Sequence, residues 1–291
     1  MKKYGILCLY IILLTLSLSG CSQNQVQTGK PQAVATVPAR GATTASTAIT
    51  TSEQVKVETP KWHPVNGNNP LPANGVPILT YHTIAALSGT DLGVPPTMFA
   101  EQMQYLHDAG YTTISLEQLY AAYHGESNLP PKPVVLTFDD GYPDNYQIAF
   151  PILKKYNFTA AFFIYTAGAD NGDMMTWQQL KEMSTYGMDI EPHTVSHADL
   201  NQLSASGQRR ELADSKAEIE HKLGTSANFF DYPKGQFDAV TLRLLPELGY
   251  QLAVTSNPGR AKRGDNIFAL RRIYIGGDLT LNAFKTKINP E

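Results

Sequence analysis

From residue 76 onward, short apolar runs alternate with longer amphipathic stretches, and this alternation restricts the fold more than any other feature of the chain. Short runs rich in β-branched and aromatic residues are typical of strands, and apolar residues three or four positions apart are typical of helices. Strands are predicted at 76–80, 112–115, 134–138, 160–165, 188–191, 229–232, 251–255 and 271–275. Helices are predicted at 96–109, 116–123, 145–156, 177–186, 206–223 and 239–248.

This strand–helix order over about 215 residues predicts an α/β protein with a parallel barrel. A doubly wound open sheet is the alternative, because it can have the same order of elements. No glycine-rich phosphate-binding loop follows any predicted strand, which argues against a nucleotide-binding version of the fold.

The start of the chain has the features of a bacterial export signal that ends in a lipid-attachment site. Two lysines precede an apolar run at 6–18, which is shorter than the about 20 residues that a membrane-spanning helix needs. Residues 18–21 read Leu-Ser-Gly-Cys and resemble the lipoprotein box, in which the peptide is cut before a cysteine that is then lipidated. We therefore expect a signal peptide at 1–20 and a lipoprotein anchored outside the cytoplasm, in the membrane of a bacterial cell envelope, through Cys21. The alternative is an ordinary signal peptide with an incidental cysteine.

Residues 21–70 have the composition of a tether rather than of a folded domain. The segment 22–59 lacks aromatic side chains and is rich in Thr, Ala, Gln and Ser, so it cannot bury enough apolar surface to fold. Five prolines between residues 60 and 77 then stiffen the approach to the domain. We expect a disordered linker at 21–70 and one folded domain at 71–291.

Charge and cysteine content exclude several classes of function. The net charge at pH 7 is −3, so the chain has no basic surplus for nucleic-acid binding. The two cysteines are Cys8 and Cys21, so the folded part has neither a disulfide framework nor a cysteine-rich metal site. A metal ion bound there would be held by His, Asp or Glu side chains.

Polar side chains directly follow four of the predicted strands. They are His82, the pair Asp139 and Asp140, the pair His193 and His197, and the turn at 232–235. In a parallel barrel, the carboxyl ends of all strands lie on one face, and that face carries the active site. Side chains that are far apart in the sequence would therefore meet there.

The two pairs have the residue types of a metal site. Asp139 and Asp140 are adjacent carboxylates, which repel each other unless a cation or a shared proton lies nearby. His193 and His197 are four residues apart, a spacing that brings two imidazoles together on a helical turn. Two imidazoles and one carboxylate suit zinc or a similar divalent ion, with positions left open for water and substrate. Taken singly, the alternatives are a plain Asp-Asp-Gly turn and two surface histidines.

These segments together resemble the polysaccharide deacetylase family, the carbohydrate esterases of family 4 with a NodB-type domain. Residues 137–141 read Thr-Phe-Asp-Asp-Gly and match the first motif of the family, and residues 193–197 read His-Thr-Val-Ser-His and match the second. The resemblance covers about residues 76–275. It implies a deformed (β/α) barrel of the NodB type.

The resemblance also implies roles for individual residues. Asp140, His193 and His197 would bind one divalent metal ion, with zinc expected and cobalt or nickel as alternatives. Asp139 would be the catalytic base. The backbone N–H of Lys234, in the segment that corresponds to the third motif of the family, is a candidate donor to the oxyanion.

The chain departs from the family pattern at two places. The third motif usually reads Arg-Pro-Pro-Tyr-Gly, whereas residues 231–235 read Asp-Tyr-Pro-Lys-Gly and lack the arginine that braces the base. Arg271 or Arg272 is a candidate replacement. The late histidine of the family is also missing, because no histidine follows His221. Instead, the domain opens with a Tyr-His pair that looks like the opening of the poly-β-1,6-N-acetylglucosamine deacetylase branch, and we predict His82 as the general acid.

The predicted activity is hydrolysis of the acetamido group of N-acetylglucosamine-type residues in an exopolysaccharide or in peptidoglycan, with release of acetate. One alternative is O-deacetylation on the same fold, for instance of xylan. Another is a carbohydrate-binding lipoprotein without catalytic activity. The complete set of metal ligands and base argues against that last alternative, because binding alone does not require it.

Overall fold

The computed structural model describes residues 62–126 and 129–289. The predicted signal peptide, Cys21 and the linker up to residue 61 lie outside these ranges. Trp62, which the sequence assigned to the linker, packs on the domain: it is buried and its N–H donates to the Tyr186 carbonyl over 2.7 Å. The packed domain thus includes Trp62 rather than beginning at residue 71. No helix within the described ranges is long and apolar enough to span a membrane.

Strands and helices alternate along most of the domain. The strands are β1 (Ile78–Tyr81), β2 (Thr112–Thr113), β3 (Pro133–Phe138), β4 (Ala161–Ile164), β5 (Asp189–Pro192), β6 (Phe229–Asp231), β7 (Leu252–Pro258) and β8 (Leu270–Tyr274). The helices are α1 (Pro96–Asp108), α2 (Leu116–Tyr123), α3 (Phe150–Lys155), α4 (Trp177–Tyr186), α5 (Ala205–Leu223), α6 (Ala239–Glu247) and α7 (Leu281–Ile288). Every predicted strand is present, and α7 is an addition to the predicted helices.

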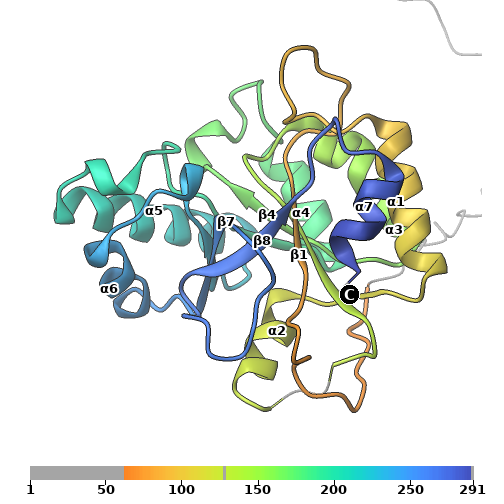
Figure 1. Ribbon diagram of the computed structural model, residues 1–291. Helices are drawn as coiled ribbons and strands as arrows, with labels where there is room; N and C mark the ends of the chain where they lie inside the picture. The colour runs from red at the N-terminus through yellow and green to blue at the C-terminus, as the bar shows by residue number, and fades with distance from the viewer. Residues whose placement is uncertain (1–61, 127–128, 290–291) are drawn as a thin grey trace, which may run out of the picture. The chain divides into compact units, whose positions relative to one another are not determined.

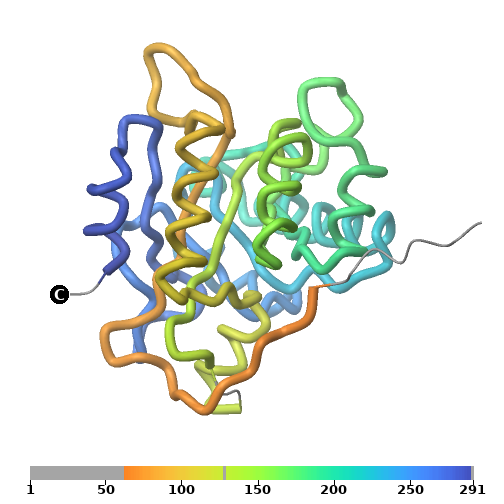
Figure 2. Tube along the Cα trace, turned by 90° about the vertical axis from the view of Figure 1, so that its right-hand side faces the viewer, coloured from red at the N-terminus to blue at the C-terminus, as the bar shows by residue number. Residues whose placement is uncertain are grey.

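The named strands pair in parallel and follow the order β5-β4-β3-β1-β8-β7-β6, with β2 paired to the first residues of β3. β1 therefore lies between β3 and β8, although it comes first in the chain. Figure 1 shows the strands at the centre with helices around them, and Figure 2 shows α1 and α7 side by side. The arrangement confirms a nearly closed (β/α) barrel rather than a doubly wound open sheet.

The barrel closes between β5 and β6 through side chains. These two strands lie at opposite ends of the sheet order, and no backbone ladder joins them in the described part of the chain. The Glu191 carboxylate accepts the Phe229 N–H over 2.9 Å, and His193 Nδ1 lies 2.9 Å from the Asp231 carbonyl oxygen. Burial raises the pKa of Glu191 well above its ordinary value. We call this β5–β6 junction the seam.

Helix boundaries follow local signals in the sequence. Ser115 and Thr176 each begin a helix with a capping box, in which the side chain accepts the N–H of the third helical residue. Gly187 ends α4 with a left-handed backbone at φ 118°. The helix predicted at 145–156 consists of a π-helical turn (Asn145–Ala149) followed by α3.

Successive side chains of a strand point to opposite faces of the sheet, so one face of the central strands packs against helices and the other carries site residues. The rings of Tyr81, Phe138 and Phe162 stack in a row, with centroids 5.3 Å and 4.7 Å apart. Phe99 of α1 packs edge-on against Tyr81 at 5.3 Å, so the row faces this helix. Asp139 follows Phe138 and lies on the other side of the strand, toward the barrel interior.

Candidate active site and metal centre

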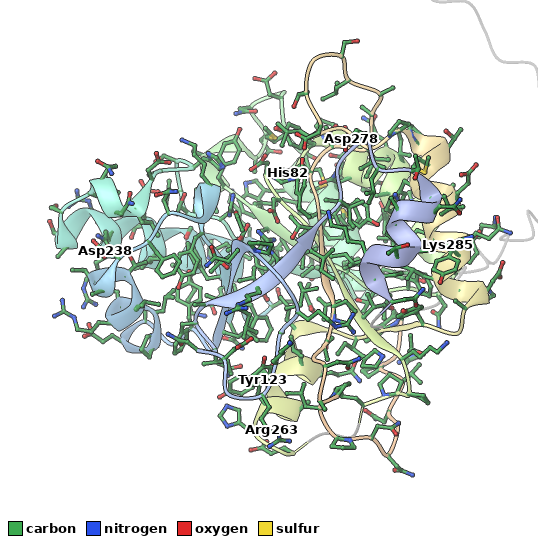
Figure 3. The ribbon with its side chains drawn as sticks, viewed as in Figure 1. His82, Tyr123, Asp238, Arg263, Asp278 and Lys285 are labelled. Carbon is green, nitrogen blue, oxygen red and sulfur yellow. The ribbon has the colours of Figure 1, made fainter. Side chains whose placement is uncertain are left out.

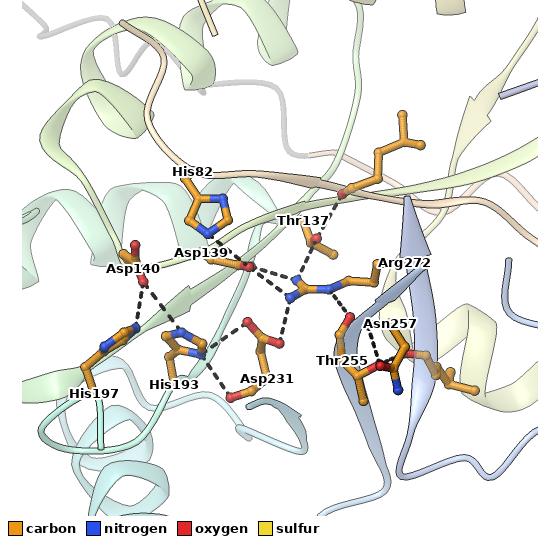
Figure 4. Close-up of polar contacts among 12 residues, drawn as sticks. His82, Thr137, Asp139, Asp140, His193, His197, Asp231, Thr255, Asn257 and Arg272 are labelled. Atoms are coloured by element: carbon orange, nitrogen blue, oxygen red, sulfur yellow. Dashed lines mark hydrogen bonds and ion pairs between the residues drawn. The ribbon is translucent and has the colours of Figure 1, made fainter. Parts of the chain in front are cut away.

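The six site residues predicted within the described ranges lie around one cavity. They are His82 after β1, Asp139 and Asp140 after β3, His193 and His197 after β5, and Lys234 after β6. The cavity has a volume of about 290 Å³. Figure 3 shows His82 at the upper end of the barrel, and Figure 4 shows the polar contacts between the site residues. The expected convergence is observed, and the roles of the residues stay predictions.

Asp140, His193 and His197 form a group that could hold a metal ion, since their ligand atoms lie within 4.8 Å of one another. Asp140 Oδ1 lies 3.1 Å from His197 Nε2 and 3.5 Å from His193 Nε2. Burial lowers the pKa of His193 to about 4, although the neighbouring carboxylates oppose the shift. The ring is therefore neutral at pH 7, which is the form that binds a metal. Two imidazoles and a carboxylate fit zinc or a similar divalent ion.

The chain turns sharply at Asp140, which aims its carboxylate at both histidines. Asp140 has a left-handed backbone at φ 73°, a conformation that Asp adopts more readily than most residues. At Gly141, φ is 90° and an added Cβ atom would lie 2.9 Å from Ile164 Cγ2, so glycine is strongly favoured. Burial favours the neutral Asp140 carboxyl, but the hydrogen bond from His197 and the nearby histidine charges lower its pKa to about 2.

The two histidines do not lie on a helical turn, so that part of the sequence prediction is wrong. Thr194 and His197 have left-handed backbones, with φ 69° and 58°, and the segment after β5 is an irregular loop. The Glu211 carboxylate of α5 holds this loop, because it accepts the N–H groups of Val195 and Ser196 over 2.9 and 3.0 Å. It also accepts the Ser196 hydroxyl over 2.8 Å. Glu211 gave no signal in the sequence beyond being a polar residue of a predicted helix.

Asp231 of β6 orients the His193 ring through Nδ1, the nitrogen that points away from Asp140. His193 Nδ1 lies 2.9 Å from the Asp231 carbonyl oxygen and 3.2 Å from its Oδ2, so Nδ1 carries the proton and Nε2 is left for a ligand. A backbone carbonyl that accepts the N–H of the far nitrogen of a histidine is typical of metal sites. The sequence marked position 231 only as a departure from the third motif.

Arg272 of β8, rather than Arg271, braces the predicted base. Its guanidinium donates to Asp139 Oδ1 over 2.7 Å and to Oδ2 over 2.9 Å, and also to Asp231 Oδ1 over 2.7 Å. Arg271 is exposed. Burial alone would raise the pKa of Asp139, but the Arg272 charge and hydrogen bonds outweigh it and hold this pKa below its ordinary value. Asp139 is therefore ionised at neutral pH. Burial prevails at Asp231, whose pKa is raised.

His82 faces the base across the cavity. Its Nε2 lies 3.8 Å from Asp139 Oδ2, and its side chain is 20% exposed. The ring packs edge-on against Tyr274 with centroids 5.9 Å apart. The Asn145 side chain donates to the His82 carbonyl over 2.8 Å, which holds the backbone beyond β1. The insertion of β1 between β3 and β8 thus brings an early histidine beside the base.

Lys234 lies in the turn Pro233–Gly235 with a left-handed backbone at φ 55°. Its backbone N–H donates to no protein group within the described ranges. The side-chain ammonium instead pairs with Asp199 at 2.8 Å. The turn therefore leaves a backbone donor available at the rim of the cavity.

Comparisons with known proteins agree with this geometry. A family model described as polysaccharide deacetylase matches residues 126–253. The chain is 37% identical over 209 residues to the putative polysaccharide deacetylase YxkH of Bacillus subtilis, and the match covers 72% of this chain and 74% of that protein. This chain belongs to the polysaccharide deacetylase family. The deacetylase is thus a hydrolase that acts on amide bonds of polysaccharides, as predicted.

Two further relatives extend the comparison. The deacetylase is 25% identical over 264 residues to the poly-β-1,6-N-acetyl-D-glucosamine N-deacetylase of Escherichia coli, a match that covers 75% of this chain but 39% of that enzyme. Its fold aligns with the Streptococcus pyogenes deacetylase PplD in complex with acetate at a TM-score of 0.71 and 34% identity. That alignment covers 74% of this chain and 99% of the other. The predicted barrel of the deacetylase family is therefore confirmed.

Proposed function

We propose that the deacetylase removes acetyl groups from N-acetylglucosamine-type residues of an extracytoplasmic polysaccharide, with one divalent metal ion bound. One observation carries the proposal: a single cavity holds an arginine-braced carboxylate, a metal-ligand triad and a histidine. Amide hydrolysis needs water to be activated and a poor leaving group to be protonated, and these groups suit both tasks. The similarity to the Escherichia coli enzyme supports an exopolysaccharide as substrate, with peptidoglycan as the alternative.

In this proposal Asp139 and His82 transfer protons, and the Lys234 N–H donates a hydrogen bond. Asp139 is ionised because of Arg272, and it accepts a proton from the attacking water. His82, when protonated, donates to the departing amine nitrogen. The Lys234 N–H donates to the oxygen on which negative charge develops. When bound at Asp140, His193 and His197, the ion would lower the pKa of water and polarise the acetyl carbonyl. Acetate and a free amine are the products.

The proposal is tested by comparing N-acetylated and O-acetylated oligosaccharides as substrates of the same zinc-loaded preparation. We expect acetate release from the N-acetylated glucosamine oligosaccharide, and we expect this release to stop on chelation and to return with zinc or cobalt. Release from acetylated xylan alone would establish an O-acetyl esterase instead. Binding of either oligosaccharide without acetate release would establish a carbohydrate-binding protein.

Replacing His82 with alanine is expected to preserve the fold and the bound metal but to slow amide hydrolysis by about 10²–10⁴-fold. The loss should be smaller for an activated acetyl ester, because its leaving group hardly needs a proton. Steady-state rates on both substrates test this, with the exposed His107→Ala variant as control. An equal loss on amide and ester, or no loss on either, would remove His82 from the role of general acid.

We also propose that the mature protein is a lipoprotein, anchored through Cys21. Wild-type protein should partition with membranes and carry a lipid at its N-terminus, and Cys21→Ala should block lipid attachment. Cell fractionation and mass spectrometry of the mature N-terminus measure both results. Cys8→Ala is the matched control, because it leaves the lipoprotein box unchanged. A wild-type protein that is released freely and carries no lipid contradicts the anchor.

A further inference from the structure

Within the described part of the chain, the His82 ring makes no hydrogen bond that would orient it. Its Nε2 lies 3.8 Å from Asp139 Oδ2, which is longer than a hydrogen bond (Figure 4). Its Nδ1 is buried and has no partner among the described residues. A hydrogen bond at one ring nitrogen usually sets the tautomer and the orientation of a histidine that transfers protons. The position of this ring therefore depends on the backbone that carries it and on its contact with Tyr274.

Asn145 holds the His82 backbone from the first position of the π-helical turn. Its side chain is fully buried, and its Nδ2 donates to the His82 carbonyl over 2.8 Å. The same nitrogen donates to Asp144 Oδ1 over 3.0 Å, so both N–H donors of the amide are used. π-helical turns are frequent at functional sites. The Asn145 amide is thus fixed by Asp144 and in turn fixes the carbonyl of His82.

Asp144 holds the two residues that follow His82. Its Oδ1 accepts the Ile84 N–H over 2.7 Å, and its Oδ2 accepts the Thr83 hydroxyl. Both Thr83 and Ile84 are buried, so these bonds are shielded from water. The consecutive residues 82–84 are therefore all bonded to Asp144 or Asn145. We call the pair Asp144 and Asn145 the clamp.

The clamp belongs to the same segment as the proposed base and one proposed metal ligand. Asp139, Asp140 and the clamp lie within the seven consecutive residues 139–145. The Asp139 N–H donates to the Tyr81 carbonyl over 2.9 Å, so this segment also bonds the backbone immediately before His82. The segment that carries the base thus holds His82 from both sides, which fixes the distance between His82 and Asp139.

We propose that Asp144 and Asn145 are positioning residues for the proton transfer by His82, an inference that rests on the proposed function. A fixed backbone is needed here, because no hydrogen bond from a described side chain orients the His82 ring. Proton transfer depends steeply on position, since a misplacement of about 1 Å can cost about 10²-fold in rate. The clamp acts through His82, because neither of its residues is among the described residues that line the catalytic cavity.

The effect of Asn145→Ala is expected to depend on the presence of His82. In the wild-type background, kcat on a β-linked pentasaccharide of N-acetylglucosamine should fall by about tenfold or more, with little change in KM. The loss on a small activated acetyl ester should be smaller, because its leaving group hardly needs a proton. In the His82→Ala background, the added Asn145→Ala change should cost less than about twofold, since the residue through which it acts is gone.

Asp144 supplies a second test, because loss of the buried Asn145 amide also reduces the stability of the fold. Asp144 is only half-buried, and Asp144→Ala should lower the ratio of the pentasaccharide rate to the ester rate in the same way. Asp144→Asn should keep most of the activity, since its oxygen can accept the Ile84 N–H and its amide can donate to the Thr83 hydroxyl. Metal content and thermal unfolding of every variant are measured beside the rates.

Asn69→Ala is the matched control. The half-buried Asn69 amide also donates to a backbone carbonyl, that of Leu129 over 3.0 Å, but this bond precedes β3 and lies at the amino end of the strand. The ratio of the pentasaccharide rate to the ester rate should therefore stay unchanged in Asn69→Ala.

The outcomes separate the clamp from the proposed function. Equal losses from Asn145→Ala on pentasaccharide and ester, or an equal loss with and without His82, overturn the clamp alone, because they indicate a structural role. Full pentasaccharide activity in both Asn145→Ala and Asp144→Ala overturns it as well. A wild-type enzyme that releases no acetate from any N-acetylated oligosaccharide overturns the proposed function together with the clamp.

Discussion

Replacing His193 or His197 with alanine is expected to abolish metal binding and to reduce acetate release by about 10³-fold or more. Each variant removes one of three proposed protein ligands, and a carboxylate with a single imidazole holds a divalent ion far more weakly. Metal content of the purified protein and initial rates on an N-acetylated oligosaccharide measure the two effects. Chelation should inactivate the wild type to the same extent.

Two controls make this prediction specific. Asp139→Asn should keep the metal and still lose about 10²–10⁴-fold in turnover, because the base is not a ligand. His221→Ala, in the last turn of α5, should change neither metal content nor rate. Full activity in protein stripped of metal would sink the proposed mechanism.

Replacing Arg272 with methionine is expected to lower the free energy of unfolding by about 3–5 kcal/mol, because it leaves the ionised Asp139 carboxylate buried without its cation. Chemical denaturation at pH 7 measures this loss. Arg271→Met is the matched control, since the adjacent arginine is exposed. Equal stability of the two variants at pH 7 would contradict the bracing role of Arg272.

Arg272→Met should also shift the pH dependence of activity. Arg272 holds the pKa of Asp139 below its ordinary value, so the wild-type base is ionised at and well below neutral pH. Without Arg272, burial prevails and the pKa of Asp139 rises. A base works only when it is ionised, so the acid limb of the kcat/KM profile should move to higher pH. The variant should also recover stability as the pH falls, because its buried carboxyls become neutral. Arg272→Lys, which keeps the charge, should shift the acid limb less.

The strands could be predicted from the sequence because each is a short apolar run bounded by polar residues, and burial in a barrel produces that pattern. α7 was missed because it is short and buries only Phe284 and Ile288, too few residues for a recognisable period. Which strands neighbour each other depends on contacts between distant segments. The position of β1 between β3 and β8 was therefore not predicted.

The site residues could be predicted where they lie in motifs, and not where a distant partner defines their role. The spacing of His193 and His197 was read as a helical turn, but it does not distinguish a helix from a loop with left-handed residues. Glu211 and Asp231 are single carboxylates whose importance lies in the groups that they hold. The choice between Arg271 and Arg272 depends on which side of β8 faces the barrel interior.

The seam between β5 and β6 links metal binding to the stability of the fold. His193 both faces the proposed ion through Nε2 and fastens β5 to β6 through Nδ1, at a junction without a backbone ladder. An ion that fixes the His193 ring would therefore also stabilise the contact between β5 and β6. A ligand present at 100 times its dissociation constant stabilises a fold by about 2.7 kcal/mol. If the proposed ion is scarce, we therefore expect the enzyme to lose resistance to proteolysis as well as activity.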